Sequence, residues 1–253
     1  MTSKKGYLKV LARNYFLFKK SSFSTFAFLL LESLFYLSAF GFGLGSFINN
    51  IEGVSYIDYF FPGLLCATAV LIPFFETTLS QFSKLSRKKL YSFWLMTPVS
   101  RKDIIIGEIL WATAKGSLAT LSVILVALPF GLVQSWLIIP CFLVLILISF
   151  LFASLGAVIV SFAETGFSVF CSPSTLILPL ILISGVLYSI DTLALPLKVI
   201  TYLLPLSHGT EAVRGLMRGT LSMMFVFHMI YLLVCASVLF QTAIQRLEKD
   251  LTA

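Results

Sequence analysis

Six long apolar segments follow one another along the chain, separated by shorter polar or basic stretches. Each segment is long enough to cross a bilayer, because about 20 helical residues span a hydrocarbon core of about 30 Å. The segments are apolar on all faces, unlike β-barrel strands, in which apolar and polar residues alternate. The pattern predicts an all-α integral membrane protein with six transmembrane helices, at residues 25–48, 59–79, 109–133, 136–162, 167–190 and 223–243.

Residues 1–24 precede the first predicted span and mix basic residues with aromatic ones such as Tyr7 and Phe16. This composition is typical of an amphipathic helix in the membrane interface, with rings at the acyl boundary and cations at the lipid headgroups. A solvated segment without fixed structure is the alternative. Residues 244–253 form a polar tail after the last span.

The loop at residues 80–108 contains a short apolar stretch beside three consecutive basic residues. About ten residues of helix fit there, too few to cross a membrane, and Pro98 ends them because proline lacks the N–H that a continuing helix needs. Ser100 and Asp103 then have the spacing of a capping box, which predicts a new helix from Arg101 into the third span. We expect the exposed side of this short helix to contact either a protein partner or the lipid surface. Its candidate contact residues are Arg87, Lys88, Lys89, Tyr91, Phe93, Trp94, Thr97 and Pro98.

The segment between the last two predicted spans, residues 191–222, contains two more short helices. A turn begins at Asp191, and Pro196 suits the first turn of a helix that Pro205 limits to about nine residues. A second helix follows from Ser207 to about Met217. Its polar and charged residues include His208, Glu211 and Arg214. Both helices are too short to span, so we expect them on the outer surface or in a re-entrant hairpin.

Composition and charge agree with a membrane protein. Hydrophobic residues make up 58% of the 253 residues and charged residues 11%, whereas soluble domains have about 25% charged residues. The net charge of +7 could suggest nucleic acid, but 14 of the 18 lysines and arginines lie in residues 1–24, 80–108 and 244–253. Six spans place these three segments on one side of the membrane. The positive-inside rule therefore predicts that both termini are cytoplasmic.

Three charged residues fall within the predicted spans: Glu32, Glu76 and Lys115. A charge in the bilayer centre is costly, so such residues usually face a partner or a water-filled path. Glu32 and Lys115 are both about 10 Å deep from the cytoplasmic side by helical rise, and we expect them to pair across the bundle. Independent extension of Lys115 to the interface is the alternative. Glu76 and Glu108 are expected to reach the cytoplasmic boundary.

Catalytic and cofactor motifs are missing from the sequence. It contains no G-x-x-x-x-G-K-[ST] loop for ATP and no G-x-S-x-G elbow. Its two histidines, His208 and His228, are too few for a zinc site. We therefore expect neither an enzyme nor a bound cofactor or metal.

Two sequence blocks resemble the type-2 ABC exporter permeases. The first is TPVSRKDIIIGEILWA, Thr97 to Ala112. The second comprises Pro179, the pair Ser184–Gly185, and YLLPLSHGTEAVR from Tyr202 to Arg214. The chain looks closest to the branch that contains exporters of nodulation lipo-oligosaccharides, polysaccharides and drugs.

The resemblance implies a permease subunit in the inner membrane of a bacterium, paired with a second copy and with two copies of a separate ATPase that binds the ATP. It implies that about Arg87 to Thr97 is the coupling helix that docks on the ATPase, and that the substrate is amphipathic or lipid-linked. Membrane lipids are the other expected partner, and nucleic acid is not one. A self-contained carrier or channel that uses Glu32, Glu76 and Lys115 is the alternative.

Overall fold

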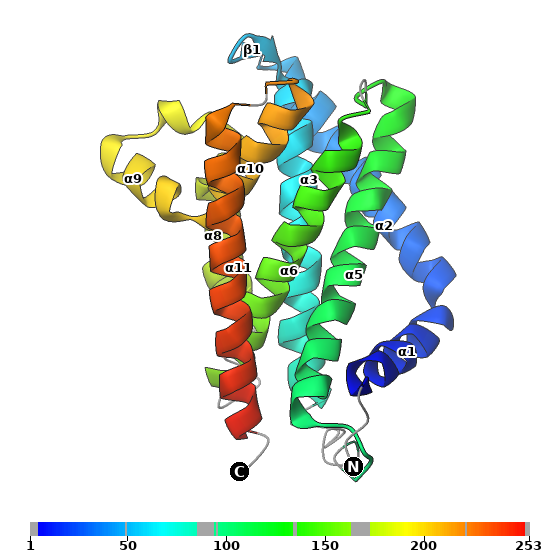
Figure 1. The fold of residues 1–253 in the computed structure, drawn as a ribbon. Coiled ribbons are helices and arrows are strands. Elements are labelled where there is room, and N and C mark those ends of the chain that lie inside the picture. The colour runs from blue at the N-terminus through cyan, green and yellow to red at the C-terminus, as the bar shows by residue number, and fades with distance from the viewer. Residues whose placement is uncertain are drawn as a thin grey trace.

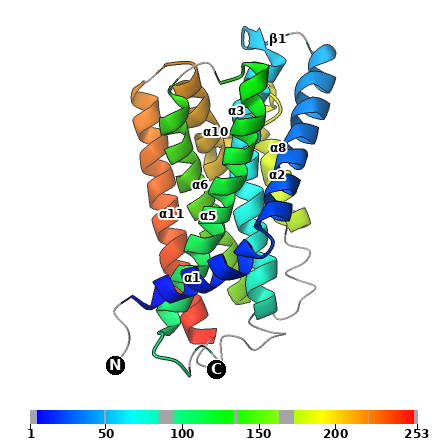
Figure 2. The same cartoon turned by 90° about the vertical axis from the view of Figure 1, so that its right-hand side faces the viewer.

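The computed structural model describes residues 5–48, 50–84, 94, 96–133, 136–162, 173–220 and 222–250. Long helices run roughly side by side in a bundle (Figure 1). A short N-terminal helix crosses the base of the bundle (Figure 2). The C-terminal end of the last helix lies at that same end, and a small β-hairpin lies at the opposite end. We call these the α1 end and the hairpin end.

The first part of the chain forms the crossing helix, two long helices and the hairpin between them. The β-hairpin is antiparallel and pairs Asn50 with Ser55 and Ile51 with Val54. The elements are α1 (Gly6–Lys19), α2 (Ser22–Tyr36), a π-helical continuation (Leu37–Gly43), a 3-10 turn (Leu44–Ser46), β1 (Asn50–Ile51), β2 (Val54–Ser55), α3 (Tyr56–Phe75) and a second π-helical continuation (Glu76–Ser80).

The second part contains three long helices and a group of short ones. The elements are α5 (Arg101–Ala127), a 3-10 turn (Leu128–Phe130), α6 (Ile138–Phe162), a π-helical segment (Pro173–Ile177), α8 (Leu178–Ile183), a 3-10 turn (Ile190–Thr192), α9 (Leu195–Leu203), α10 (Pro205–Met217) and α11 (Met223–Asp250). Pro196 lies in the first turn of α9, as the sequence predicts, and α9 ends at Leu203, before Pro205. α10 begins at Pro205, two residues before the predicted start at Ser207.

Five helical segments in the described part of the chain are long and apolar enough to cross a membrane. They correspond to the first, second, third, fourth and sixth predicted spans. Their bounds are Ser22–Ser46, Tyr56–Ser80, Arg101–Phe130, Ile138–Phe162 and Met223–Lys249.

The fifth predicted span, residues 167–190, differs from the expectation. Residues 163–172 lie outside the described residues, and α8 ends at Ile183 instead of continuing to Ile190. Gly185 has a φ of 74°, a left-handed backbone that glycine adopts without steric cost. The prediction of a helix continuous to Ile190 is therefore wrong. Hydropathy measures only how apolar a segment is, so it does not show that the helical backbone ends before Gly185.

The core lies between α3, α5 and α6, which pack against one another, and α11 packs against α6. Buried residues make up 72% of the most apolar part of α3 but only 11% of that part of α11. α3 is therefore a central helix. Most of the apolar surface of α11 faces away from the bundle, which suits contact with lipid or with another protein.

Candidate functional site

The start of α5 is anchored at the α1 end by hydrogen bonds to the carboxylate of Asp103. The backbone N–H of Asp103 donates to Ser100 Oγ at 3.1 Å, and the backbone N–H of Ser100 donates to Asp103 Oδ2 at 3.2 Å. This is the capping box that the sequence predicts. The other carboxylate oxygen, Oδ1, accepts from the backbone N–H of Tyr7 at 3.2 Å. Asp103 therefore joins α1 to α5, a role that the motif alone does not indicate.

α1 lies unusually close to α5. A Cβ added at Gly107 would lie 2.6 Å from Cβ of Val10 and 3.1 Å from the carbonyl oxygen of Tyr7. Such distances are too short for any larger side chain at this position. The glycine at 107 therefore lets the two backbones approach, and Val10 is fully buried between them.

The described part of the predicted coupling segment is attached to this α1–α5 junction. Trp94 packs against a buried cluster of Val10, Val99 and Ile104. The guanidinium carbon of Arg13 lies 5.5 Å from the centre of the Trp94 ring, within cation–π range. We call Trp94, Val10, Arg13, Val99 and Ile104 the junction cluster.

The backbone turns sharply just after Trp94. The backbone N–H and the hydroxyl of Thr97 both donate to the carbonyl of Trp94, at 2.9 and 2.6 Å. Pro98 follows, as predicted, before the start of α5. Residues Arg87, Lys88, Lys89, Tyr91 and Phe93 of the predicted coupling helix lie outside the described residues.

Partly buried ion pairs tie the segment that follows α3 to α5. Lys84 Nζ lies 2.5 Å from a carboxylate oxygen of Glu108, and the side chain of Glu108 is 4% exposed. Lys115 Nζ lies 2.8 Å from a carboxylate oxygen of Glu76. The expected pairing of Lys115 with Glu32 is wrong, because Lys115 on α5 faces the π-helical continuation of α3, where Glu76 lies. Glu32 on α2 instead lines an apolar hollow between α2, α3 and α8.

The non-helical backbone after α8 is held by side chains from other helices. Arg214 Nη2 donates to the carbonyls of Gly185 and Val186 at 2.7 and 3.3 Å. The hydroxyl of Tyr59 donates to the carbonyl of Tyr188 at 2.9 Å. Arg214 is 2% exposed, and its guanidinium carbon lies 3.8 Å from the centre of the Tyr59 ring.

Two threonines complete this set of donors. Thr201 Oγ1 donates to the carbonyl of Ile183 at 3.1 Å, and Thr210 Oγ1 donates to the carbonyl of Ser184 at 3.3 Å. Carbonyls that have left a helix need such donors, because unsatisfied polar groups are costly away from water. We call Tyr59, Thr201, Thr210 and Arg214 the carbonyl clamp. It joins α3, α9 and α10 to the end of α8.

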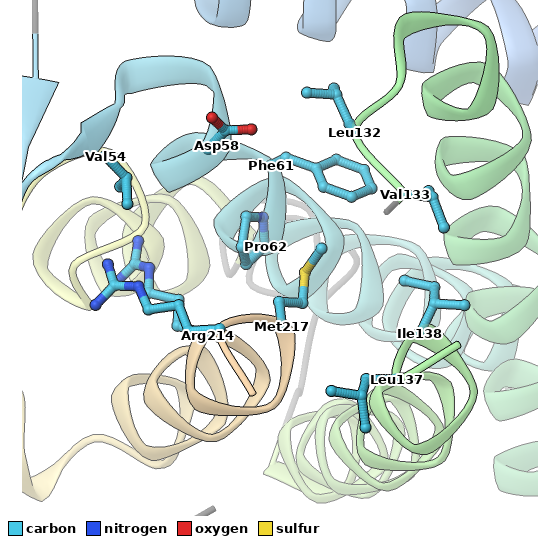
Figure 3. Close-up of a pocket in the computed structure, with 11 residues that line it drawn as sticks. Val54, Asp58, Phe61, Pro62, Leu132, Val133, Leu137, Ile138, Arg214 and Met217 are labelled. Carbon is cyan, nitrogen blue, oxygen red and sulfur yellow. The ribbon is translucent and has the colours of Figure 1, made fainter. Parts of the chain in front are cut away.

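A cavity of about 240 Å³ lies beside the clamp at the hairpin end. Figure 3 shows apolar side chains of α3, α6 and α10 around it, with Asp58 and Arg214 among its polar residues. Arg218, which also lines the cavity, binds Glu52 through both terminal nitrogens at 3.0 Å. Burial raises the pKa of the Glu52 carboxyl, but hydrogen bonds from Ser189 and Arg218 outweigh it and leave this pKa below its ordinary value.

The predicted outer-helix residues cluster around α10. His208 Nδ1 lies 2.8 Å from His228 Nδ1, and His208 Nε2 lies 2.9 Å from the carbonyl of Tyr202. Burial lowers the pKa of His208. Glu211 pairs with Arg214 at 3.4 Å. In the described part of the chain, no three His, Cys, Asp or Glu side chains lie together as a metal site.

Asp191, the remaining outer residue that the sequence singles out, lies in the 3-10 turn that leads to α9. Its carboxylate forms an ion pair with Lys198 on α9. Both side chains are on the exposed side of the short helices, so this contact is a local link and not part of the clamp.

Comparison with known proteins decides the family. The chain matches the ABC-2 type transporter family over residues 7–218. It belongs to that family. Nodulation protein J of Rhizobium leguminosarum bv. viciae is 32% identical over 216 residues, covering 85% of this chain and 83% of that protein. The inner membrane transport permease YadH of Escherichia coli (strain K12) is 26% identical over 215 residues, covering 81% of this chain and 82% of that protein.

The match to the ABC-2 type transporter family includes both ends of the bundle. All of α1 except Gly6, the junction cluster and the carbonyl clamp lie within residues 7–218. The chain is thus a transport permease of this family, and the family is not one of enzymes.

Sequence reasoning missed the partners that hold these sites in this ABC-2 permease. Val10 and Arg13 on α1 contact Trp94, and Tyr59 on α3 contacts the break after α8. Basic and aromatic residues were visible in the first 24 positions, but nothing local indicates that they face the loop after α3. The sequence placed Arg214 on the second outer helix and at the end of the second block that resembles the family, but neither observation indicates that it binds the backbone after α8.

Proposed function

We propose that this chain is the membrane-spanning permease of an ABC exporter. It moves an amphipathic or lipid-linked substrate, such as a glycolipid, a polysaccharide or a drug, out of the cytoplasm. A separate ATPase binds and hydrolyses the ATP. Membership of the ABC-2 type transporter family supports this proposal, and the name of the relative YadH, an inner membrane transport permease, supports a location in the inner membrane of a bacterium.

The observation that carries the proposal is the junction cluster. Trp94 lies in a loop between two candidate spans, yet it packs on α1 and on the start of α5. A protein that pushes on this loop would therefore displace α5 and α1 together, as packed elements move as rigid bodies. In this proposal the ATPase drives the permease through its contact with this loop, so the permease needs no ATP site of its own. The lack of a P-loop in its sequence agrees with this.

The proposed assembly is the one that the resemblance to the type-2 ABC exporter permeases implies. Two copies of the permease bind two copies of the ATPase, with the segment from about Arg87 to Thr97 as the coupling helix. The segments that carry 14 of the 18 basic residues face the cytoplasm, with both termini. Contact between Lys102 and Glu248 at 3.7 Å supports this, because it brings the start of α5 and the end of α11 to one side.

The proposed topology has six spans, the fifth passing through residues 167–190 with a break in its outer half. The predicted interfacial helix at residues 1–24 corresponds to α1 (Gly6–Lys19), because α2 already begins at Ser22. The short helices at residues 191–222 lie at the outer face, since the proposed orientation puts the α1 end in the cytoplasm.

Co-purification tests the coupling contact. The tagged permease is expressed with its candidate ATPase, a P-loop protein sought in the neighbouring reading frames, and the stoichiometry of the purified complex is measured with Trp94→Ala and with the matched change Trp136→Ala. Trp136 is 76% exposed and lies before α6, away from the loop. We expect Trp94→Ala to lose most of the bound ATPase and Trp136→Ala to retain it. If both variants retain the same amount of bound ATPase, the proposed coupling role of this loop is wrong.

Transport measurements separate the exporter from a self-contained carrier. Proteoliposomes that contain the complex are given ATP without an ion gradient, and then an ion gradient without ATP. The proposal requires movement of a lipid-linked substrate only with ATP. Movement driven by the gradient, in liposomes that hold the permease alone, contradicts it.

A further inference from the structure

Two hollows lie one after the other between α2 and α3. The first has a volume of about 220 Å³ and is bounded also by α5 and α8; the second has about 490 Å³ and reaches toward the α1 end. Leu29 and Ile72 line both of them. The hollows are therefore adjacent parts of one depression, which we call the α2–α3 groove. Its size is within the range of small-molecule sites in proteins.

The walls of the groove are mainly apolar and open to the surroundings of the bundle. Phe28 at one hollow is 63% exposed, and Tyr36 and Leu182 at the other are 40% and 51% exposed. In a membrane this opening faces hydrocarbon or a neighbouring chain. A molecule could thus enter the groove sideways without crossing the core of the bundle.

Charges in the groove do not balance. Three charged side chains line the two hollows: Glu32, Glu76 and Lys115. Lys115 Nζ forms an ion pair with Oε2 of Glu76 at 2.8 Å, and it also lies 5.8 Å from the centre of the Trp111 ring. Among the residues lining the groove no second basic side chain is left for Glu32. The groove therefore carries one uncompensated carboxylate in apolar surroundings.

We propose that the α2–α3 groove binds a lipophilic monocation, with the positive charge beside Glu32 and the apolar body in the hollow between α2, α3 and α8. An unpaired carboxylate within a span is costly, and the attraction of opposite charges is stronger there than in water. A cation that brings its own apolar surface relieves this cost and needs no further basic residue. As a substrate class for the exporter this rests on the proposed function, whereas the binding itself does not.

Three hydroxyls that line the hollow beside Glu32 are already hydrogen-bonded, which supports this choice. Ser33 Oγ contacts Ser122 Oγ at 3.2 Å and donates to the carbonyl of Leu29 at 2.7 Å. Thr68 Oγ1 donates to the carbonyl of Leu64 at 2.9 Å. These hydroxyls have satisfied their donors within their own helices, so they do not define a dedicated site for a sugar or a phosphate. Of the three charged side chains that line the groove, Glu32 is the one without a partner among the residues that line it.

Direct binding of tetraphenylphosphonium tests the proposal. The full-length permease is reconstituted in lipid nanodiscs, and the Kd of the labelled cation is measured for the wild type, Glu32→Gln, Glu32→Asp and Glu248→Gln. Glu248 is the matched control, because it lies near the end of α11 and pairs with Lys102, outside the groove. Tetraphenylborate, an anion of the same shape, serves as the competitor.

We expect Glu32→Gln to weaken binding of the cation at least tenfold. Glu32→Asp, which keeps the charge, and Glu248→Gln are expected to remain within about threefold of the wild type. Tetraphenylborate should not compete. If a lipid chain or a second copy occupies the groove instead, Glu32→Gln binds the cation as the wild type does, and that result overturns the proposal. Competition by tetraphenylborate equal to that by unlabelled cation also overturns it.

The result is independent of the exporter function. If the permease binds the cation through Glu32 but never associates with an ATPase, the groove assignment stands and the proposed function fails. If ATP-driven transport is observed but Glu32→Gln leaves cation binding unchanged, the exporter stands and the groove assignment fails.

Discussion

Replacement of Arg214 by methionine tests the carbonyl clamp most directly. Arg214 is 2% exposed and donates to the carbonyls of Gly185 and Val186, which lie in the non-helical backbone after α8. Methionine has a similar length and is apolar, so it fills much of the same space. It can neither donate to these carbonyls nor form the cation–π contact with Tyr59.

The expected loss can be worked out from these contacts. Each buried carbonyl left without a donor costs about 1–3 kcal/mol, and a desolvated cation–π contact contributes about 2 kcal/mol. Removal of a buried charge offsets part of this, because the desolvation of the guanidinium is no longer required. We therefore expect Arg214→Met to lower the free energy of unfolding by about 2–4 kcal/mol.

Arg218→Met provides the matched control. Arg218 lies just after α10, and its ion pair with Glu52 has side chains that are 37% and 36% exposed. Exposed ion pairs contribute about 1 kcal/mol or less. Both variants and the wild type are purified in one detergent, and their free energies of unfolding are measured by titration with sodium dodecyl sulfate. The clamp interpretation requires a clearly larger loss for Arg214→Met.

Two results would refute this reasoning. Equal losses for Arg214→Met and Arg218→Met would mean that burial of the clamp carries no extra energy. A loss below about 1 kcal/mol for Arg214→Met would mean that water or other donors satisfy the carbonyls after α8.

Three further predictions concern other parts of the bundle. Lys115→Met leaves Glu76 unpaired and should lower the free energy of unfolding by about 1–3 kcal/mol. The double variant Lys115→Met, Glu76→Gln should recover most of this loss in a double-mutant cycle. Additive effects of the two substitutions would contradict the pairing. Gly107→Leu should displace α1 from α5 and accelerate tryptic cleavage within α1, and unchanged cleavage would show that the helices are not in tight contact. The pKa of His208 is lowered by burial, so the unfolded state binds more protons as the pH falls below about 6.5 and stability should decrease there. The slope of unfolding free energy between pH 7.5 and 5 should be smaller in His208→Gln than in the wild type, and identical slopes would exclude this site.

The histidine contact gives the pH prediction a geometric basis. His208 Nε2 faces a carbonyl and so carries a proton, which leaves its Nδ1 as the acceptor for the Nδ1–H of His228. A proton added to Nδ1 of His208 puts two donors face to face at 2.8 Å unless His228 moves its own proton to Nε2. Protonation therefore costs either this contact or a change of tautomer at His228, and this cost acts in the same direction as burial.

Local features were predictable wherever one stretch of chain contains all the atoms involved. The capping box of Ser100 and Asp103, the helix start near Pro196 and the end of that helix before Pro205 depend on neighbouring residues alone, and the structure shows all of them. Long apolar stretches likewise identified five segments that the structure makes into helices of sufficient length.

Contacts between distant segments were not predictable in the same way. Equal depth suggested Glu32 as the partner of Lys115, but depth does not say toward which neighbour a side chain points. The rotation of α5 about its axis decides that, and it turns Lys115 toward Glu76. Similarly, no local signal shows that Arg13 reaches Trp94.

Hydropathy, capping and proline act over a few neighbouring residues, so the class of protein, five of the long helices and the capped start of α5 could be predicted from the chain alone. Which charges pair, where the backbone after α8 finds its donors and how α1 lies on α5 became known from the packed fold. These depend on the rotation and packing of helices that are far apart in the chain. The end of α8 shows this most clearly. Its apolar sequence is compatible with a continuing helix, but donors from α3, α9 and α10 satisfy the carbonyls there and so stabilise the break.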